Sequence, residues 1–439
     1  MKILLTSDLN PSQVNGVIVS VLNLMKELEK KGHDVRLLCL SPNHHSYSSG
    51  KTYYVGSMPL NIYPDVRASL MISSKLLDEV CDWCPDIIHS QCEFFTYSFV
   101  ERIAKRCKAP IVHTYHTLYE HYVQYVLPGQ VMQDLIAPVM RVRLRTADVV
   151  IAPTRKTKRL LFQKGVADHV VVIPTGIDLS KYEVSLSEEE RKAMVRKLDI
   201  PEDALIYGSV GRLAEEKNLD EVLQAHKRLL EERPDVYLVL VGDGKYRKQL
   251  EEEVDSLEIR DRVRFTGMVS PDEVGKYYRL FSFFISASVS ETQGLTYIEA
   301  LANGRPVIAR RDDAPVEVIQ EGVDGFIFDT TDQAVDRIKA LVDDPDRLAA
   351  MSRAAWDSRE AFGTERFGDR VNALYERVLE TPGKSQLERE RIMSKLADQF
   401  TLLTDRSDYG KFYDIMRAKW SRASFRMKTK SLAKKGSLK

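Results

Sequence analysis

Short apolar runs alternate with longer amphipathic segments along most of this chain. In one of these segments Val17, Val21, Leu24 and Leu28 are spaced as on one face of a helix. Short buried strands between helices are typical of a parallel sheet that is covered on both faces. The strands expected in the first half cover residues 2–8, 34–40, 86–89, 110–114, 148–152 and 170–174. Those expected in the second half cover residues 204–211, 236–242, 262–266, 281–286 and 306–309.

A strongly charged stretch between residues 181 and 201 separates the two runs of strands. Two doubly wound units in tandem place a cleft between them, with ligand-binding loops at the carboxyl ends of the strands. We therefore expect an α/β fold with two Rossmann-like domains, residues 1–178 and 179–365. Residues 366–439 are expected to form a C-terminal extension, whose helices return to the first domain before a basic amphipathic tail.

Charge is unevenly distributed, although the 439 residues carry a formal net charge of zero. Residues 415–439 contain nine Lys or Arg and no Asp or Glu. Residues 409–427 combine an aromatic face with a basic one, which is typical of a helix on an anionic membrane surface. Alternatively, this helix packs on the first domain and is followed by a frayed basic end. No aromatic-basic nucleic-acid-binding module is visible, so we expect no nucleic acid partner.

The composition favours an ordinary globular protein, with 44% hydrophobic and 29% charged residues. No window of about 18 apolar residues occurs, and residues 1–5 are too short for a targeting core. We expect a cytoplasmic protein that is peripheral on the inner face of the cell membrane.

Five cysteines fall in the first quarter of the chain. The spacing of Cys81, Cys84, His89 and Cys92 suggests a zinc site at first sight. Ligands along a strand alternate between its two faces, however, so these side chains are not expected to converge. We expect reduced thiols and no metal site.

The segment 290–302 carries the most specific chemistry. An apolar strand precedes it, and helical periodicity follows its glycine. The residues expected at the helix N-terminus are Gln293, Gly294, Leu295 and Thr296. Free amides and the helix dipole favour an anion there. Glu291 lies in the loop before the helix and Glu299 about one turn into it. Amides for phosphate and carboxylates for hydroxyls suit a sugar nucleotide.

A second phosphate-binding element follows the strand at residues 204–211. Gly211 makes a turn, and Arg212 and Lys217 come just before a helix. A guanidinium binds two phosphate oxygens and an ammonium adds a point charge. Gly242 ends the next strand, but the segment after it lacks the third glycine of a dinucleotide fingerprint. We therefore expect no cofactor, and a tight turn at the cleft edge.

The first half contributes two further loops. Asn15 and Gly16 end the loop after the first strand, where a glycine lets the backbone approach a phosphate or a sugar closely. His116 follows a buried strand, at the position where loops of parallel sheets host chemistry, and is a candidate for a sugar contact. His113 and His121 are expected to serve the structure or to line the acceptor side.

Together these motifs resemble the retaining GT-B glycosyltransferases of family 4, over about residues 1–380. The matching residues are Asn15-Gly16-Val17, His116, Thr175-Gly176-Ile177-Asp178, Gly211-Arg212, Lys217, Gly242-Asp243-Gly244, Glu291 and Glu299. The resemblance implies that Arg212 and Lys217 hold the nucleotide diphosphate and that Glu299 binds the ribose. It also implies that Glu291 and His116 contact the transferred sugar.

Within this family, residues 113–122 and 291–299 look most like those of bacterial 1,2-diacylglycerol 3-alpha-glucosyltransferases. Those enzymes move glucose from UDP-glucose to a membrane diacylglycerol. The resemblance thus implies a retaining hexosyltransferase that uses UDP-glucose or another UDP-hexose, a lipid acceptor and an anionic membrane surface. It implies attack on the face that the leaving group departs from, with a phosphate oxygen taking the acceptor proton. No Asp-x-Asp metal motif stands in a suitable loop, so we expect protein cations to replace Mg²⁺.

Other functions stay open at this point. Residues 11–14 replace the more usual aromatic-rich approach to the first glycine, so a polyprenyl, phosphoinositide or soluble acceptor is an alternative. The residues do not distinguish glucose from galactose. A non-catalytic scaffold of the same fold is a different class of function. The joint presence of His116, Arg212, Lys217 and Glu291 argues against it.

Overall fold

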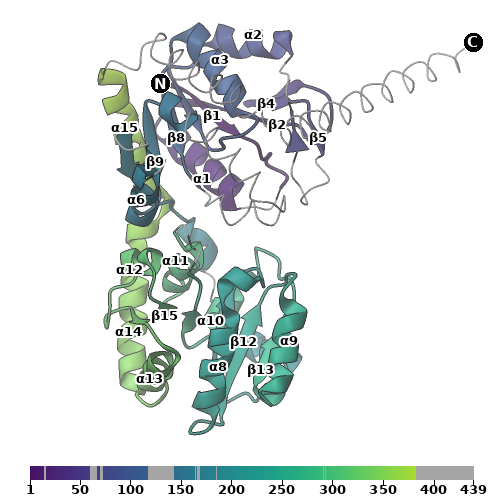
Figure 1. Ribbon diagram of the computed structural model, residues 1–439, viewed down its shortest axis with the longest axis vertical. Coiled ribbons are helices and arrows are strands. Elements are labelled where there is room, and N and C mark those ends of the chain that lie inside the picture. The colour runs from purple at the N-terminus through teal and green to yellow at the C-terminus, as the bar shows by residue number, and fades with distance from the viewer. Residues whose placement is uncertain are drawn as a thin grey trace, which may run out of the picture.

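The computed structural model describes residues 1–13, 16–59, 67–69, 73–116, 143–163, 165, 169–183, 185–289, 291 and 293–381. Two α/β units lie one above the other in Figure 1, and each is built on its own sheet. The two parallel sheets that the apolar runs predict are confirmed. The expected tail, together with Asn15 and His121, lies outside the described residues.

The first domain has an eight-stranded sheet in the order β10-β9-β8-β7-β1-β2-β4-β3, in which only β3 runs antiparallel to its neighbour. Its strands are β1 (Lys2–Ser7), β2 (Asp34–Leu40), β3 (Tyr47–Ser49), β4 (Thr52–Val55), β7 (Ile87–Ser90), β8 (Ile111–Thr114), β9 (Val149–Ala152) and β10 (Val170–Val172). Its helices are α1 (Gly16–Lys30), α2 (Ser74–Trp83), α3 (Tyr97–Cys107) and α6 (Arg155–Gln163). A separate hairpin pairs β5 (Met58–Pro59) with β6 (Arg67–Ala68).

The second domain has a six-stranded parallel sheet in the order β13-β12-β11-β14-β15-β16. Its strands are β11 (Leu205–Val210), β12 (Val236–Val241), β13 (Val263–Phe265), β14 (Phe284–Ser286), β15 (Val307–Arg310) and β16 (Gly325–Phe328). Its helices are α7 (Glu188–Lys197), α8 (Leu219–Leu230), α9 (Arg247–Ser256), α10 (Val274–Leu280), α11 (Leu295–Ala302), α12 (Asp313–Val318), α13 (Thr331–Val342) and α14 (Pro345–Ser358). The strand order reverses between β11 and β14, where doubly wound sheets bind their ligands.

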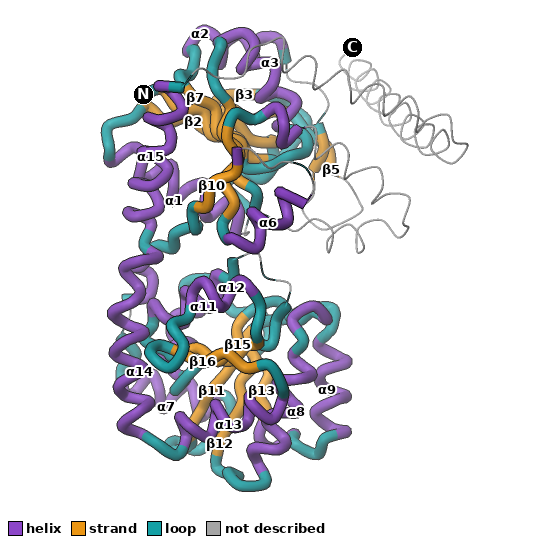
Figure 2. The backbone as a smooth tube through the Cα atoms, turned by 60° about the vertical axis from the view of Figure 1, so that its left-hand side comes forward, coloured by secondary structure: helices purple, strands orange, loops and turns teal. Residues whose placement is uncertain are grey.

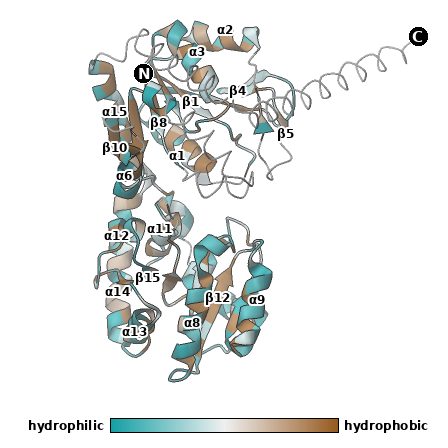
Figure 3. Ribbon diagram, in the orientation of Figure 1, coloured by the Kyte–Doolittle hydropathy of each residue, from teal (hydrophilic) through white to brown (hydrophobic). Residues whose placement is uncertain are grey.

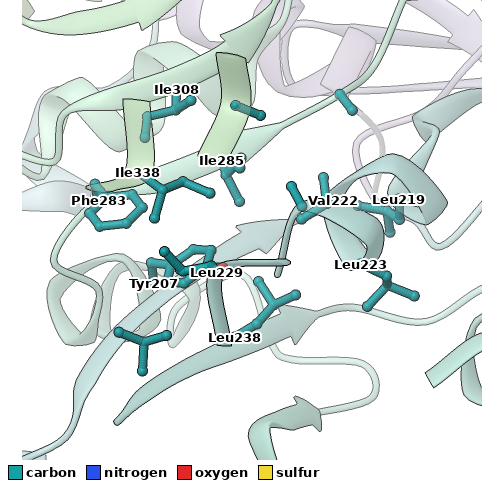
Figure 4. Packing of buried hydrophobic residues seen from close by; sticks show 14 of the residues in the cluster. Tyr207, Leu219, Val222, Leu223, Leu229, Leu238, Phe283, Ile285, Ile308 and Ile338 are labelled. Atoms are coloured by element: carbon teal, nitrogen blue, oxygen red, sulfur yellow. The ribbon is translucent and has the colours of Figure 1, made fainter. Parts of the chain in front are cut away.

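Most strands of both sheets are buried, although β3 is exposed, and the outer helix faces are polar, as Figure 3 shows for β12 between α8 and α9. In the core of the second domain, Val222 and Leu223 of α8 pack near Leu238 of β12 (Figure 4). Because both faces of each sheet are covered, the strands read as continuous apolar runs and not as alternating ones.

The charged segment between the two runs of strands contains a helix, α7. Ser187 and Glu190 form a capping box, with each side chain bonded to the other residue's backbone N–H. Acidic residues occupy the first turn and basic residues the last, which complements the helix dipole. Capping and charge order therefore produce a helix in a stretch with little apolar character.

A final helix, α15 (Thr364–Glu380), leaves the second domain and packs against α1 of the first. Figures 1 and 2 show α14 beside one sheet and α15 beside the other. Phe367, Val371 and Tyr375 of α15 are buried in the core of the first domain. The two chain crossings between the domains touch, since a Cβ on Gly176 would lie 2.7 Å from the carbonyl oxygen of Gly363. Only glycine fits such a close backbone approach.

The histidine and cysteines of the suspected zinc spacing have separate surroundings. His89 bonds to Thr114 and Tyr375, whereas the thiol of Cys92 lies 3.8 Å from the hydroxyl of Ser7. Within the ranges that the structure describes, no cluster of His, Cys, Asp or Glu could hold a metal ion. No helix in those ranges is long and apolar enough to cross a membrane.

Candidate active site

The predicted donor residues meet at the switch point of the second sheet. Arg212 and Lys217 follow β11, Lys217 as the last residue of the short 3₁₀ helix η3 (Glu215–Lys217). Glu291 follows β14, the strand hydrogen-bonded to β11. Because both loops leave the carboxyl ends of neighbouring parallel strands, residues some 75 positions apart line one crevice.

Lys217 and Glu291 form an ion pair in this crevice. The Nζ of Lys217 lies 2.5 Å from Oε1 of Glu291, and the exposed fractions of the two side chains are 27% and 16%. Burial alone raises the pKa of the Glu291 carboxyl, but the Lys217 charge and hydrogen bonds from Lys217 and Ser288 outweigh it. The pKa of Glu291 is therefore lowered. This carboxylate stays ionised and can accept hydrogen bonds from hydroxyl groups.

Arg212 lies at the mouth of the crevice, with its guanidinium 2.6 Å from Glu216 and 40% of its side chain exposed. The loop that carries it touches the loop after β12. A Cβ on Gly242, which has a φ of +130°, would lie 2.0 Å from the carbonyl oxygen of Gly211. Gly242 thus serves close loop packing, in agreement with the tight turn expected at this position.

A cavity of about 640 Å³ opens beside this crevice. Arg212 and Glu216 line one side of it, and Gly242, Tyr246 and Met268 are among the residues on the other. Its size falls within the range of small-molecule sites, and its walls are mainly apolar with a few polar groups. The arrangement can hold a flat apolar group next to a diphosphate.

Helix α11 begins beside the crevice, after Gly294 in a left-handed conformation with a φ of +74°. The first amides of a helix have no acceptor in a preceding turn, and Thr296 lines the crevice with Lys217 and Glu291. The side chain of Gln293 has a different partner. Its amide oxygen accepts from the N–H of Thr175 and its amide nitrogen donates to the Thr175 carbonyl, both at 2.8 Å. Gln293 therefore ties the donor loop to the crossing between domains.

Glu299 lies one turn into α11 with partners of its own. Its Oε2 accepts a hydrogen bond of 2.8 Å from the hydroxyl of Tyr278, and Tyr182 also bonds to it. Burial raises the pKa of Glu299, and these hydrogen bonds offset only part of that effect. The two glutamates of the motif thus differ, since Glu291 faces a cation and Glu299 faces tyrosines. The ribose contact of Glu299 stays a prediction.

The first domain approaches the site through the start of α1. A Cβ on Gly16 would lie 3.9 Å from Cδ1 of Leu295, so the first turns of α1 and α11 face each other across the cleft. Asp178, another predicted residue, lies in the crossing between the domains. Its Oδ1 accepts from the backbone N–H and the hydroxyl of Ser180, at 3.2 and 2.6 Å. These bonds outweigh burial and lower the pKa of Asp178.

His116 follows β8, and its Nε2 lies 2.6 Å from Oε1 of Gln91. Burial and the neighbouring His113 lower the pKa of His116 to about 3, so its imidazole is neutral near pH 7. His113 is buried, with Nε2 3.1 Å from Oε1 of Glu93. Gln91 and Glu93 were not among the sequence candidates. The signal for them is their place directly after the neighbouring strand β7.

Helices α6 and α12 form further contacts between the domains. Glu317 of α12 accepts hydrogen bonds from the backbone N–H groups of Arg155 and Lys156, and so caps α6 from the other domain. The ammonium of Lys156 also pairs with Asp312 and donates to the carbonyl of Val289. These contacts, which the sequence did not predict, join the two domains directly.

Comparisons with known proteins agree with this geometry. Residues 14–181 match the family model described as glycosyltransferase family 4, and residues 190–357 match glycosyl transferases group 1. An alpha-monoglucosyldiacylglycerol synthase of Streptococcus pneumoniae is 37% identical over 380 residues, which cover 85% of each chain. The protein of that name from Acholeplasma laidlawii is 27% identical and covers 82% of this chain and 93% of its own.

The fold agrees with a solved structure, that of Anabaena Alr3699/HepE in complex with UDP and glucose. Its TM-score is 0.66 at 18% identity, and the match covers 86% of this chain and 99% of that one. Two facing Rossmann-like domains with a C-terminal helix that crosses between them constitute the GT-B architecture. The chain is a GT-B glycosyltransferase and belongs to glycosyltransferase family 4.

Proposed function

We propose that this enzyme transfers glucose from UDP-glucose to a membrane diacylglycerol and forms an alpha-glycolipid. The observation that carries the proposal is the 37% identity, along 85% of both chains, to an alpha-monoglucosyldiacylglycerol synthase. Arg212, Lys217 and Glu291 line one crevice, and this combination of two cations and a carboxylate suits a sugar nucleotide.

Arg212 and Lys217 are the groups that bind the diphosphate of the donor. The leaving group gains negative charge as the bond to the sugar breaks, and preorganised cations and amides stabilise that charge. The first amides of α11 add partial positive charge beside the same crevice. With these groups in place, the reaction runs without a divalent metal ion.

Glu291 and His116 bind the transferred hexose. Glu291 is held ionised by Lys217 and accepts from sugar hydroxyls. His116 approaches from the first domain as a neutral imidazole, and Glu299 binds the ribose of the nucleotide. Transfer retains the configuration at the sugar: the acceptor hydroxyl attacks the face that the leaving group departs from, and a phosphate oxygen takes its proton.

The acceptor reaches the cleft from a membrane surface. Residues 415–439, with their nine cations, supply attraction to anionic lipid, and the protein is peripheral on the inner face of the cell membrane. That segment lies outside the described residues, so this part of the proposal rests on its sequence and on the relatives' names.

The test is incubation of the purified full chain with radiolabelled UDP-glucose, UDP-galactose or GDP-mannose and with vesicles that contain diacylglycerol. Thin-layer chromatography should show one labelled glycolipid, formed from UDP-glucose and equally in EDTA, and NMR of the product should show an alpha linkage. Label in a soluble or polyprenyl product only contradicts the proposed diacylglycerol acceptor. A requirement for Mg²⁺ or Mn²⁺ contradicts the proposed reaction without a divalent metal ion. No transfer from any donor to any acceptor would indicate a non-catalytic scaffold.

A further inference from the structure

Polar side chains pair across the carboxyl ends of β7 and β8, below the proposed sugar site. His89 and Thr114 share a hydrogen bond of 2.7 Å, and Gln91 and His116 share one of 2.6 Å. Both pairs join residues 25 positions apart, as expected for two rungs on one face of two parallel strands. The two pairs are the separate rungs of a ladder, and His116 belongs to its outer rung.

The inner end of the ladder is fixed by the C-terminal helix. The hydroxyl of Tyr375 in α15 and Nδ1 of His89 share a hydrogen bond of 2.6 Å. Both residues are completely buried, and burial and the neighbouring histidines lower the pKa of His89 far below its usual value. The base of the ladder is therefore neutral, and His116 is the least buried of its members.

Gln91 has a feature that stability does not explain. Its side chain is only 2% exposed, and among the residues that the structure describes its amide nitrogen has no hydrogen-bond partner. An unpaired buried N–H is costly, whereas an apolar side chain of similar size would leave none. The amide oxygen, which contacts His116, is the part of Gln91 that the arrangement uses.

An amide oxygen only accepts hydrogen bonds, so the Nε2 of His116 must carry the proton of the neutral ring. The other ring nitrogen, Nδ1, is then an acceptor without a hydrogen. We propose that Gln91 is a positioning residue that holds His116 in the Nε2–H tautomer, so that Nδ1 accepts a hydrogen bond from a hydroxyl of the donor hexose. This proposal rests on the proposed function.

Among the described residues, the titratable groups near His116 are His113 on the neighbouring part of the same segment, His89 on β7 and Glu93 in the loop after β7. His113 disfavours the imidazolium of His116, and the Glu93 carboxylate is paired with His113. The contact of His116 itself is with an uncharged amide. Replacing Gln91 with glutamate would place a negatively charged carboxylate beside the ring nitrogen and stabilise the imidazolium.

The tautomer is tested on the full chain with ring ¹⁵N-labelled histidine and no substrate. Long-range ¹⁵N spectra distinguish Nε2–H from Nδ1–H rings, and a His116→Asn variant identifies the signal. The wild type should show the Nε2–H form. Gln91→Leu should give a mixture of tautomers, and Gln91→Glu should show a ring that titrates at higher pH. His226, which bonds to Tyr207 in the second domain, should be unchanged throughout.

Kinetics separate positioning from a structural role. Gln91→Leu should lower kcat for sugar transfer about 10-fold to 100-fold, the size typical of an orienting partner, with UDP affinity within about twofold. Gln91→Glu keeps an acceptor for Nε2–H and should restore turnover near pH 8, but lose it as the pH falls. Gln224→Leu, which removes a surface amide bonded to Glu253, is the matched control.

The outcomes distinguish this inference from the proposed function. An Nδ1–H ring in the wild type, or an unchanged tautomer in Gln91→Leu, overturns the positioning role whatever the enzyme transfers. A lower melting temperature of Gln91→Leu with normal kcat and an unchanged pH profile of Gln91→Glu also overturns it. If the tautomer responds as expected while no lipid is glucosylated, the proposed function fails and the positioning role stands.

Discussion

The two halves of the cleft hold their polar groups in different ways. In the second domain the polar groups form ion pairs: Lys217 pairs with Glu291 and Arg212 with Glu216, at the loops after β11 and β14. In the first domain, His116 pairs with the uncharged amide of Gln91 and has a strongly lowered pKa. The difference agrees with the proposal that one side binds a highly charged group and the other orients hydroxyls without adding charge.

The largest effect is expected from removing the cations of the second domain. Arg212→Ala and Lys217→Ala should each lower kcat/KM about thirtyfold or more, because loss of a partly buried contact to a charged group typically costs about 2–5 kcal/mol. The measurement is kcat/KM for UDP-glucose, with thermal unfolding to show that the fold is intact.

Lys217→Ala also tests the coupling of this cation to Glu291. Without the ammonium, burial dominates and the pKa of Glu291 rises. When the pH is lowered, the variant should therefore lose its remaining activity at a higher pH than the wild type does. Lys248→Ala, which breaks an exposed pair with Glu252, is the matched control. If Arg212→Ala and Lys217→Ala both keep near-normal activity, these two cations do not bind the donor diphosphate as proposed.

A smaller effect is expected from the groups that contact the sugar. Glu291→Gln and His116→Ala should lower turnover about tenfold to a hundredfold and leave UDP affinity nearly unchanged. Glu299→Gln should mainly weaken UDP binding, because it removes a proposed acceptor for the ribose. Calorimetry with UDP and initial-rate kinetics separate these cases. Equal losses of UDP affinity in all three variants would show that the sugar and ribose roles are not divided in this way.

The link between the halves is tested by Gln293→Leu. This change leaves the buried N–H and carbonyl of Thr175 without partners, and we expect about 2 kcal/mol or more of lost stability. Turnover should fall moderately, while UDP affinity is kept because Arg212 and Lys217 are unaltered. Urea unfolding measures the stability, with Gln224→Leu as the control. An unchanged unfolding midpoint would mean that the hydrogen bonds between Gln293 and Thr175 do not stabilise the fold.

The smallest effect on donor chemistry is expected from removing residues 415–439. Hydrolysis of UDP-glucose should be little changed, because the donor residues all precede residue 300. Binding to anionic vesicles should fall far more than binding to neutral ones, since each cation contributes about 1 kcal/mol at most and salt screens it. Flotation at low and high salt measures this, with Trp420→Ala to separate insertion from charge. Equal flotation of both proteins would make the tail structural.

The second half of the site was predictable because its parts are local. Strand, glycine turn, cation and helix start follow one another within a few residues around Arg212, and strand, carboxylate, glycine and helix start do so around Glu291. The loops touch because parallel strands place their carboxyl ends together. The short strands β3 and β4 were missed because β3 is polar and exposed, and so gives no apolar pattern.

The first half was predictable only as far as His116. Nothing near Gln91 in the sequence marks it as a partner of a residue 25 positions away, because the pairing depends on β7 lying beside β8. The same holds for Gln293, whose side chain bonds to Thr175, 118 positions away in the chain.

The sequence by itself determined most of the strands of both sheets, where the two runs of strands divide, and which cations and carboxylates are available for a sugar nucleotide. These are local properties of apolar spacing, glycine turns and helix ends. The tertiary structure alone decided which carboxylate faces a cation, which histidine is held neutral, and how α15 anchors the first domain to the second. Each of these depends on burial and on distances between residues far apart in the chain, which local patterns do not encode.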